Sequence, residues 1–568
     1  MLFQAENPPA SVLTGLRAAS AFLRQCFGTS SKGAEDLSKH RKGSVKDPPD
    51  SLRTGSGAGQ ERRQELVQER PQVLWPETHR PQRPPILLST KSRQIGNAQQ
   101  TGSPIPPVAH LFVALQLMSN KFPSALLRSL IQEHGIEDQA FIDTHERGAQ
   151  VTSVRLNPQK RTTKFDQAEL VPWCADGRYL AERPSFIADP LFHAGCYYVQ
   201  EASSMFLEQI LKHTCDLESN LRVLDLCAAP GGKSTLIASL INDQSLLVSN
   251  EIIKSRVPVL SDNLTKWGTS NCVVTNNDPR DFNRLDGYFD VMVVDAPCSG
   301  SGMFRKDPMA INEWSENNVQ LCSERQQRIL ANACPALAQG GVLIYSTCSY
   351  SKKENEDIAD WLCDTYGLKT IRIPLDASWG IEETKSDKHR CFGYRFYPHQ
   401  IKGEGFFITC FQKTEGDVKH AESSKALRIN ASDESILKRW IHEPDHTIHP
   451  AKDGYCFIAP QFLADVRHLQ SRLYVKKSGV YAGKIVGKDL VPDQELAQSL
   501  LLSPNIQRAE LDEEQALMYL RKDTLELDGL PTGWTLMCYQ DFGLGWAKVL
   551  PNRINNYYPR EMRILKEF

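Results

Sequence analysis

A regular alternation of apolar strands and helices between residues 221 and 346 constrains the fold of this chain more than any other feature. The pattern predicts strands at Arg222–Leu226, Leu246–Asn250, Cys272–Thr275, Phe289–Val294 and Gly341–Ser346, and helices at Ser234–Ile241, Ser255–Trp267 and Glu324–Ala338. Phe392–Gln412 is typical of a closing antiparallel hairpin. Strands that alternate with helices form a parallel sheet covered on both faces, so we expect an α/β domain of the doubly wound type.

The flanking regions follow other patterns. Phe122–Gly135 predicts a short amphipathic helix that ends at glycine, and short mixed segments follow it up to Tyr198. Gly416–Ser424 is polar and resembles a linker. From about Leu437 we expect a separate, strand-rich region, interrupted by a helix at Asp512–Arg521. A length of 568 residues suits three or four domains of roughly 150 residues each.

The first 105 or so residues are rich in Pro, Gly, Ser, Gln and Arg and show little hydrophobic periodicity. Residues 1–100 carry 15 basic and 9 acidic side chains, so a basic, disordered extension is expected. Ser11–Phe27 has Arg17 and Arg24 among apolar residues and leaves a transit peptide open as an alternative, although Glu6 precedes it.

Composition excludes several classes of protein. The net charge of −2 argues against a protein that coats polyanions indiscriminately, but it allows a local basic groove. The 15 cysteines include no C-x-x-C pair, so neither a zinc site nor any other metal is expected, and reduced thiols fit a cytoplasmic protein. No apolar run approaches the ~20 residues of a membrane span.

A turn of small residues follows the first strand, in the sequence VLDLCAAPGGKS (Val223–Ser234). Such a turn lets the backbone and a helix N-terminus approach a ligand. The end of the motif also fits a phosphate-binding P-loop, but Cys227 stands where the first glycine of that motif belongs. Glu251 ends the second strand, 20 residues after Gly231, and a carboxylate there can bind both hydroxyls of a ribose. This pattern allows a dinucleotide or S-adenosylmethionine, and Asp278 follows the third strand where it could meet an adenine amino group.

Two cysteines follow the next two strands. The fourth strand ends in VVDAPCSGSG, with Asp295 and Cys298, and the fifth ends in LIYSTCSYS, with Cys348. A thiolate added to C6 of cytosine turns C5 into a nucleophile for a methyl sulfonium, and a second group must then help the C5 proton to leave. Two thiols that flank the ring would meet both needs, Asp295 could hydrogen-bond the N4/N3 edge, and Lys233 could supply positive charge. The residues alone leave open which cysteine is the nucleophile.

The motifs DLCAAPGGKS, DAPCSGSGMFRKDP and YSTCS together resemble the family of RNA cytosine-5 methyltransferases, over roughly Phe122–Lys413. The resemblance implies a Rossmann-like class I methyltransferase domain that uses S-adenosyl-L-methionine. It implies that Cys348 is the nucleophile that forms a covalent adduct with cytosine C6, that Cys298 assists product release, and that Asp295 contacts the base. Lys233 is catalytic in some relatives. The implied cofactor contacts are Cys227, Ala228, Ala229, Pro230, Gly231, Gly232, Lys233, Glu251, Asp278 and Asp295.

The C-terminal sequence GLGWAKVLPNRINNYYPREMRI (Gly543–Ile564) resembles the PUA-like RNA-binding domain of the bacterial small-subunit rRNA methyltransferase F group. There, basic side chains interleave with Trp546, Tyr557 and Tyr558, a mixture that binds phosphates and stacks on bases. Arg155 and Asn157, in SVRLNPQK, match the family's short RNA-facing segment. The expected RNA contacts are Arg155, Asn157, Lys548, Arg553 and Arg560, with Arg563 in the same basic stretch.

These observations predict a disordered extension (1–107), a small α+β RNA-binding subdomain (108–200), the methyltransferase domain (201–415), a linker (416–436) and a strand-rich PUA-like region (437–568). The expected function is formation of 5-methylcytosine in RNA, most of all 16S rRNA or the small ribosomal subunit, by a monomeric cytoplasmic protein without a membrane anchor. Two alternatives remain: the same reaction on tRNA, and a catalytically silent RNA-binding or ribosome-assembly factor. The unbroken cofactor turn and the two cysteines count against the silent factor.

Overall fold

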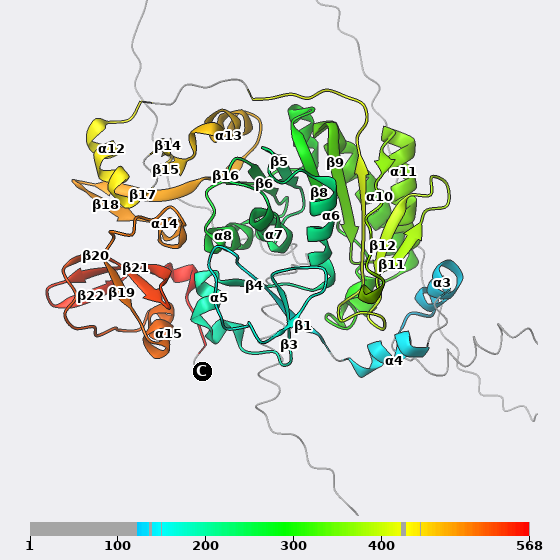
Figure 1. Cartoon of the computed structure of the whole chain (residues 1–568), viewed down its shortest axis with the longest axis horizontal. Coiled ribbons are helices and arrows are strands. Elements are labelled where there is room, and N and C mark those ends of the chain that lie inside the picture. The colour runs from blue at the N-terminus through cyan, green and yellow to red at the C-terminus, as the bar shows by residue number, and fades with distance from the viewer. Residues whose placement is uncertain (1–121, 136–138, 149, 422–427, 443–444, 567–568) are drawn as a thin grey trace, which may run out of the picture. The chain divides into compact units, whose positions relative to one another are not determined.

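A computed structural model describes residues 122–135, 139–148, 150–421, 428–442 and 445–566 of the chain (Figure 1). The expected N-terminal extension and the transit-peptide alternative lie outside these residues, as does part of the expected linker. Within the described residues, no helix combines the length and apolar character that crossing a bilayer requires.

The central sheet has the strand order β11-β12-β13-β9-β8-β5-β6-β7-β16 (Figure 1). Its parallel core consists of β5 (Arg222–Asp225), β6 (Leu246–Asn250), β7 (Cys272–Thr275), β8 (Phe289–Asp295) and β9 (Leu337–Thr347). The expected hairpin is present as β12 (Phe392–Phe396) and β13 (Phe406–Gln412), which extend the sheet beyond β9 in antiparallel pairing, and β11 (Glu382–Lys385) follows them. The order in which successive strands join the sheet reverses between β5 and β8, and the crevice at such a switch point is where ligands bind in doubly wound sheets.

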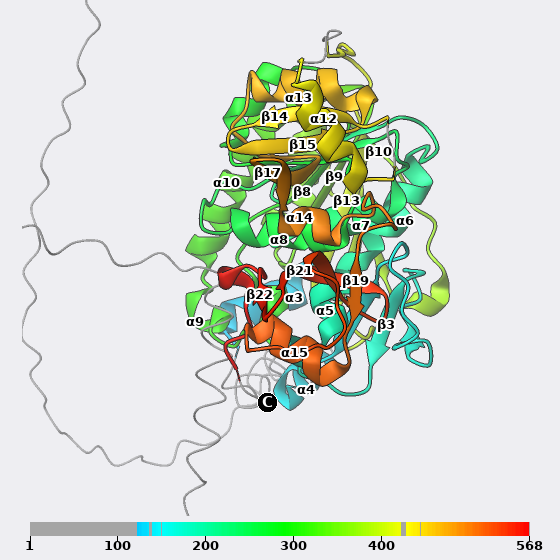
Figure 2. The same cartoon turned by 90° about the vertical axis from the view of Figure 1, so that its left-hand side faces the viewer.

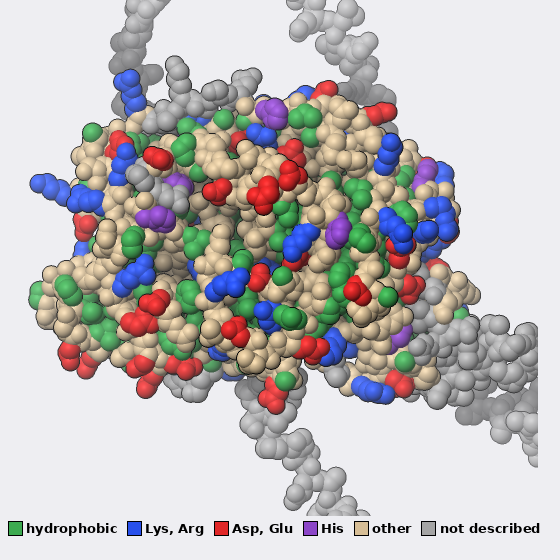
Figure 3. Space-filling model, in the orientation of Figure 1, with side chains coloured by type: hydrophobic (Ala, Val, Ile, Leu, Met, Phe, Trp, Pro, Cys, Tyr) green, Lys and Arg blue, Asp and Glu red, His purple; other side chains and the backbone are tan. Residues whose placement is uncertain are grey.

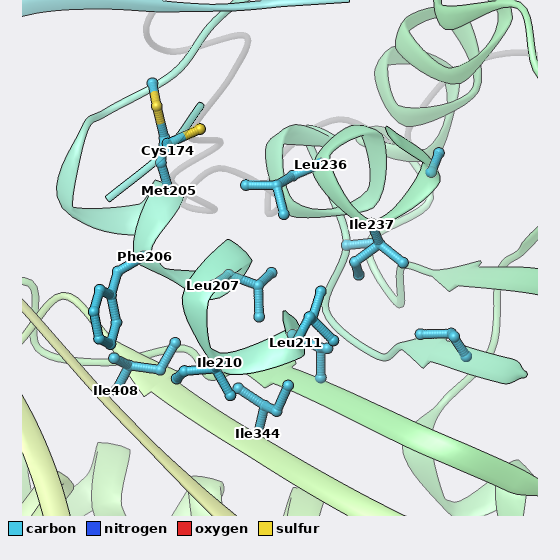
Figure 4. Packing of buried hydrophobic residues seen from close by; sticks show 14 of the residues in the cluster. Cys174, Met205, Phe206, Leu207, Ile210, Leu211, Leu236, Ile237, Ile344 and Ile408 are labelled. Carbon is cyan, nitrogen blue, oxygen red and sulfur yellow. The ribbon is translucent and has the colours of Figure 1, made fainter. Parts of the chain in front are cut away.

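Helices cover both faces of this sheet, as the alternating pattern predicts. One face packs against α6 (Leu207–Thr214), α7 (Gly232–Leu240) and α8 (Val257–Trp267). Figure 4 shows Ile210 of α6 beside Ile344 of β9 and Ile408 of β13. The other face packs against α10 (Glu316–Ala333), α11 (Glu356–Tyr366) and α13 (Leu463–Gln470). Apolar burial on two sides explains why the central strands are continuous apolar runs.

The helix expected at Glu324–Ala338 differs from α10 at both ends. It begins eight residues earlier, because Ser315 accepts a hydrogen bond from the Asn318 backbone N–H at 3.1 Å and caps the first turn. It ends at Ala333, where Pro335 interrupts the helical hydrogen bonds and a short 3-10 turn leads into β9.

A smaller sheet of order β2-β3-β1-β4 precedes the central domain. Its longest strand is β1 (Thr152–Leu156), flanked by β3 (Gly177–Leu180) and β4 (Tyr197–Val199) with antiparallel pairing, and β2 is Glu169–Leu170. Ahead of it lie α3 (Ser124–His134), which ends at the left-handed Gly135 as expected, and α4 (Gln139–Arg147).

The C-terminal region is strand-rich, as predicted. Its first sheet contains β14 (Thr447–Ala451), β15 (Gly454–Ile458), β17 (Val480–Val486) and β18 (Asp489–Pro492). Its second sheet contains β19 (Arg508–Glu510), β20 (Gly533–Tyr539), β21 (Phe542–Leu550) and β22 (Arg553–Asn556), with α15 (Glu513–Arg521) capped by Asp512.

This region is not separate from the α/β domain, which corrects the expectation. Strand β16 (Val475–Ser478) pairs with β7 and forms an edge of the central sheet (Figure 2 shows the C-terminal elements from the side). The Arg222 guanidinium of β5 also lies 2.7 Å from Asp465 of α13. The segment Val475–Ser478 is too short and too polar for its pairing partner to be inferred from periodicity.

Candidate active site

The turn between β5 and α7 has the geometry that its glycines predict. Gly231 has a φ of 117°, a value that side chains other than glycine rarely adopt, and α7 begins directly after it. The backbone N–H of Ala228 donates to the Asn250 carbonyl at 2.8 Å and ties the turn to the end of β6. The first N–H groups of α7, which have no acceptor within the helix itself, thereby lie at the carboxyl edge of the sheet.

Asp225, at the end of β5, is fully buried beneath this turn. Its Oδ2 accepts a hydrogen bond of 2.7 Å from the Ser234 hydroxyl, whereas Oδ1 accepts none within the described part of the chain. Burial raises the pKa of Asp225 to about 7, while the Ser234 hydrogen bond and the charge of Lys233 oppose the rise. A buried carboxylate with an unused oxygen suits a site that receives a cationic ligand.

Glu251 and Asp278 lie at the ends of β6 and β7, where the sequence places them. Glu251 is 3% exposed, its Oε1 accepts from the Ile253 N–H at 2.7 Å, and its Oε2 lies 3.2 Å from Arg256. Burial raises the pKa of Glu251, and Arg256 opposes that shift. Asp278 is less buried and caps a short 3-10 turn by accepting from the Arg280 N–H at 3.1 Å.

Asn250 joins the loops that follow three strands, a role that was not predicted from the sequence. Its Nδ2 donates to the carbonyls of Leu226 at 3.1 Å and Asn277 at 3.0 Å, and its Oδ1 accepts from the Asn277 N–H at 3.0 Å. These bonds hold the turn after β5 against the loop that carries Asp278. In the sequence, Asn250 is marked only by its place at a strand end next to Glu251, and the prediction of a ligand contact was made for Glu251 alone.

Lys233 and Asp295 form an ion pair, with Nζ 2.8 Å from Oδ2. Asp295 Oδ1 accepts a hydrogen bond of 2.8 Å from the Ser346 hydroxyl, and Lys233 Nζ lies 5.1 Å from the centre of the Phe406 ring. Lys233 therefore bridges from α7 to the end of β8, and its ammonium is engaged by a carboxylate. This arrangement differs from that of a P-loop lysine, which turns toward phosphates.

Cys298 and Cys348 lie in contact at the same edge of the sheet, with their Sγ atoms 3.1 Å apart. Both are partly exposed, and the Gly302 N–H donates to the Cys348 carbonyl at 2.9 Å, which joins the two loops. The hydrogen bond with Cys348, burial and the charge of Glu354 raise the pKa of the Cys298 thiol. Two thiols that flank a base ring were expected, but a ring does not fit between these sulfurs. A ring between them would require a separation of about 7 Å between the two Sγ atoms, or two van der Waals contacts.

Arg155 and Asn157 do not face solvent, which corrects their expected contact with RNA. Arg155 is 1% exposed, donates to Gln200 at 2.9 Å and Thr235 at 2.6 Å, and stacks its guanidinium 4.6 Å from the Trp267 ring. Asn157 is fully buried, and its Nδ2 donates to the Gly195 and Trp267 carbonyls. Both residues hold the small N-terminal sheet against the helices beside the glycine turn.

In the predicted RNA-binding stretch of the C-terminal sheet, some of the named side chains are exposed and others are buried. Arg553, Arg560 and Arg563 are exposed, and Lys548 is partly exposed and lies 5.0 Å from the Trp534 ring. Tyr557 is 45% exposed, whereas Trp546 and Tyr558 are buried in the domain core and cannot stack on bases. On the face shown in Figure 3, charges of both signs are interspersed.

A doubly wound sheet whose glycine turn, buried strand-end carboxylate and paired thiols share one edge fits the class of S-adenosylmethionine-dependent RNA methyltransferases. Three family models match the chain in agreement with this class. They are 16S rRNA methyltransferase RsmB/F over residues 212–412, the N-terminal domain of 16S rRNA methyltransferase RsmF over 122–202, and the methyltransferase RsmF PUA domain over 507–564.

Two relatives of this chain are also described as rRNA methyltransferases. The chain is 31% identical over 435 residues to a ribosomal RNA small subunit methyltransferase F of Shewanella loihica, which covers 72% of this chain and 88% of the relative. Against the protein of that description from Shewanella woodyi, identity is 33% over 413 residues, or 69% of this chain and 84% of the relative. A crystal structure of a methyltransferase homolog from Pyrococcus horikoshii aligns with a TM-score of 0.46 and 25% identity, over 54% of this chain and 100% of that one.

The chain belongs to the 16S rRNA methyltransferase RsmB/F family. It is an S-adenosylmethionine-dependent RNA methyltransferase with a Rossmann-like domain and a C-terminal PUA domain. Residues 413–506, which include β16 and Asp465, lie between the segments that the family models match.

Proposed function

We propose that this protein forms 5-methylcytosine in small-subunit (16S) rRNA through a covalent adduct between Cys348 and cytosine C6. The observation that carries the proposal is the contact between two partly exposed thiols, 3.1 Å apart, at the sheet edge that also carries the Lys233–Asp295 ion pair. Cytosine methylation at C5 needs a nucleophile at C6 and a group that accepts the C5 proton, and two adjacent thiols supply both.

The cofactor site fits S-adenosylmethionine. Glu251 is held by Arg256 with its carboxylate at the end of β6, where it would bind the ribose hydroxyls, and Asp278 would meet the adenine. The turn from Cys227 to Gly232 would lie along the methionine portion, and the unused Asp225 oxygen suits its cationic groups. When bound, the cofactor supplies an electrophilic methyl group on a sulfonium.

The protein's own side chains would bind the base, attack C6 and allow the product to leave. Asp295 would accept a hydrogen bond from the amino group of cytosine, with Lys233 and Ser346 holding the carboxylate in place. Cys348, as a thiolate, would form the bond to C6, and the electron pair of the C5–C6 double bond would make C5 nucleophilic. After C5 has become methylated, loss of its proton would restore the double bond and expel the Cys348 thiolate.

Cys298 suits the role of proton acceptor in that last step. The hydrogen bond with Cys348 is the largest cause of the raised pKa of Cys298, and it disappears once Cys348 is bonded to the base. Cys298 can then release its own proton to solvent, because it is partly exposed, and take up the C5 proton. Cys298 is therefore protonated before Cys348 attacks the base, and it becomes a proton acceptor after the adduct has formed.

Small-subunit rRNA is favoured over tRNA by the regions outside the α/β domain. Both the N-terminal and the PUA models are of RsmF type, and the relatives are described as small subunit rRNA methyltransferases. Lys548, Arg553, Arg560 and Arg563 would bind phosphates and position the RNA, while a cytosine leaves its stack to reach the two thiols. We also propose the division at 108–200, 201–415, 416–436 and 437–568, in which the last region contributes β16 to the central sheet. A monomer that acts on the small ribosomal subunit and a cytoplasmic location are proposed with it.

Transfer of tritium from the methyl group of labelled cofactor to RNA tests the proposal. The wild type should label small-subunit rRNA at C5 of cytosine, read by bisulfite sequencing, while Cys348→Ala should bind RNA without labelling it. Label in tRNA instead would support the tRNA alternative. RNA binding without any label from the wild type would identify a silent RNA-binding factor.

A further inference from the structure

Glu354 is a buried carboxylate that joins the two cysteine loops. It lies in a short 3-10 turn (Lys352–Glu354) after the Cys348 loop and is fully buried. Its Oε1 accepts from the Ser299 N–H at 2.8 Å, and its Oε2 accepts from the hydroxyls of Ser299 and Ser349 at 2.6 Å each. Ser299 directly follows Cys298 and Ser349 directly follows Cys348, so one carboxylate holds the residue next to each thiol.

Neighbouring residues extend this bracing to both sides of the cysteines. Gln326 of α10 donates to Glu354 Oε1 at 3.2 Å and to the Pro297 carbonyl at 3.0 Å, just before Cys298. Asn355 accepts from the Thr347 hydroxyl at 2.6 Å and donates to the Ser349 carbonyl at 2.8 Å, on both sides of Cys348. The distance between the two sulfurs thus depends on a network with Glu354 at its centre.

The Glu354 carboxylate is also placed to act electrostatically. Its two oxygens accept four hydrogen bonds, from the Ser299 N–H and the side chains of Ser299, Ser349 and Gln326, an arrangement that favours the ionised form although burial raises its pKa. The titratable groups around it are Cys298 after β8, Cys348 after β9, Tyr345 of β9 and Cys322 of α10, and its charge raises the pKa of Cys298, Cys322 and Tyr345.

We propose that Glu354 is a positioning residue with two effects on Cys298 and Cys348. It sets the spacing of the two thiols, and, when the pair has lost one proton, it keeps the remaining proton on Cys298, so that Cys348 is the thiolate. This inference rests on the proposed function, in which one thiol attacks C6. It gives a physical reason why two neighbouring cysteines have different roles. Glu354 accepts hydrogen bonds from both the backbone N–H and the hydroxyl of Ser299, the residue next to Cys298, but only from the hydroxyl of Ser349, the residue next to Cys348. Its charge therefore disfavours a second negative charge on Cys298, and a proton there removes the repulsion.

The test compares Glu354→Gln with the wild type and with Glu208→Gln. Glu208 of α6 is a buried carboxylate, 4% exposed, whose partners are Lys212 and the Ala175 N–H and not residues of the cysteine loops. Each protein is given RNA whose target cytosine carries fluorine at C5, so that no C5 proton can leave and the adduct persists. Peptide mapping of the trapped complex then identifies the attached cysteine, and the pH profile of kcat/KM is measured on ordinary RNA.

The wild type and Glu208→Gln should carry the RNA on Cys348 alone. Glu354→Gln should keep its RNA affinity and its unfolding temperature, lower kcat roughly tenfold or more, and carry part of the adduct on Cys298. Removal of the charge should also move the acidic limb of its profile to lower pH by about one unit, because thiolate formation becomes easier. Loss of structure alone would lower the rate without moving that limb.

Two outcomes are distinguishable. If the wild type forms no adduct, the proposed function fails, whatever Glu354 does. If the wild type forms it on Cys348 and Glu354→Gln shows the same site and the same pH limb, the role of Glu354 is contradicted while the proposed function stands. Glu354→Asp, which keeps the charge on a shorter side chain, should retain Cys348 as the attached residue even where its rate is reduced.

Discussion

The Sγ atoms of Cys298 and Cys348 lie 3.1 Å apart although 50 residues separate them in the chain. The contact results from the sheet, because parallel pairing of β8 with β9 brings the carboxyl ends of both strands to one edge. No base ring fits between the sulfurs at this distance. Both thiols must therefore reach the ring from one side, or the two loops must separate when the base enters.

Two thiols in contact should be sensitive to oxidation. Diamide, an azo compound that takes up two electrons and two protons, should convert Cys298 and Cys348 to a disulfide and abolish RNA methylation. Dithiothreitol should restore activity, and peptide mapping of the oxidised protein should find the two cysteines linked.

Cys363 and Cys391 provide the control for this prediction, because their Sγ atoms lie 3.3 Å apart elsewhere in the fold. Cys363→Ser removes that second pair and should leave the inactivation by diamide unchanged. Protection of the enzyme by Cys363→Ser would mean that the second pair, and not the thiols at the sheet edge, accounts for the loss.

The exposed cations of the C-terminal sheet should act on RNA affinity and not on chemistry. Replacing Lys548, Arg553 and Arg560 together by alanine should weaken RNA binding and reduce the slope of log affinity against log salt concentration by about two to three, while kcat at saturating RNA is retained. Filter binding at several salt concentrations measures both quantities. Removal of three other exposed cations, Arg372, Lys388 and Lys402, should leave the slope nearly unchanged.

Arg155 should behave in the opposite way, because it is buried. Arg155→Ala removes a guanidinium that donates to Gln200 and Thr235, and should lower the free energy of unfolding by roughly 3 kcal/mol or more. Thermal unfolding measures this loss. A fully stable Arg155→Ala protein with weakened RNA binding would restore the original expectation that this residue contacts RNA.

Asp225 should make stability depend on pH in a definite direction. Its pKa of about 7 in the fold lies above that of an unfolded aspartate, so the folded state binds more protons between pH 4 and 7, and stability falls as pH rises through that window. Asp225→Asn accepts the Ser234 hydrogen bond without a charge, and its unfolding temperature should fall less than that of the wild type between pH 5 and 7.5. An equal fall in both proteins would contradict the perturbed carboxyl.

Sequence reasoning predicted the elements that periodicity and motifs specify. The order and type of the elements in the central sheet, the turn at Gly231 and the acidic residues Glu251 and Asp278 lie where the pattern places them, because each is determined by local chemistry or by alternation. The bounds of α10 differ, because its cap at Ser315 and the break at Pro335 set them. It failed where the answer depends on contacts that are distant in sequence. The partner of β16, the burial of Arg155 and the bridge made by Glu354 are set by tertiary packing, which leaves no periodic signal in a short segment or a single residue.

The most direct test of the account is a denaturing gel of Cys298→Ala incubated with cofactor and small-subunit RNA. Elimination should stall after the base has been methylated, because no second thiol accepts the C5 proton, so a protein band shifted by covalently bound RNA should appear. Cys298→Ala combined with Cys348→Ala should give no shifted band. A Cys298→Ala protein that binds RNA and is never shifted, or a shift that persists without Cys348, would contradict the assignment of Cys348 as nucleophile.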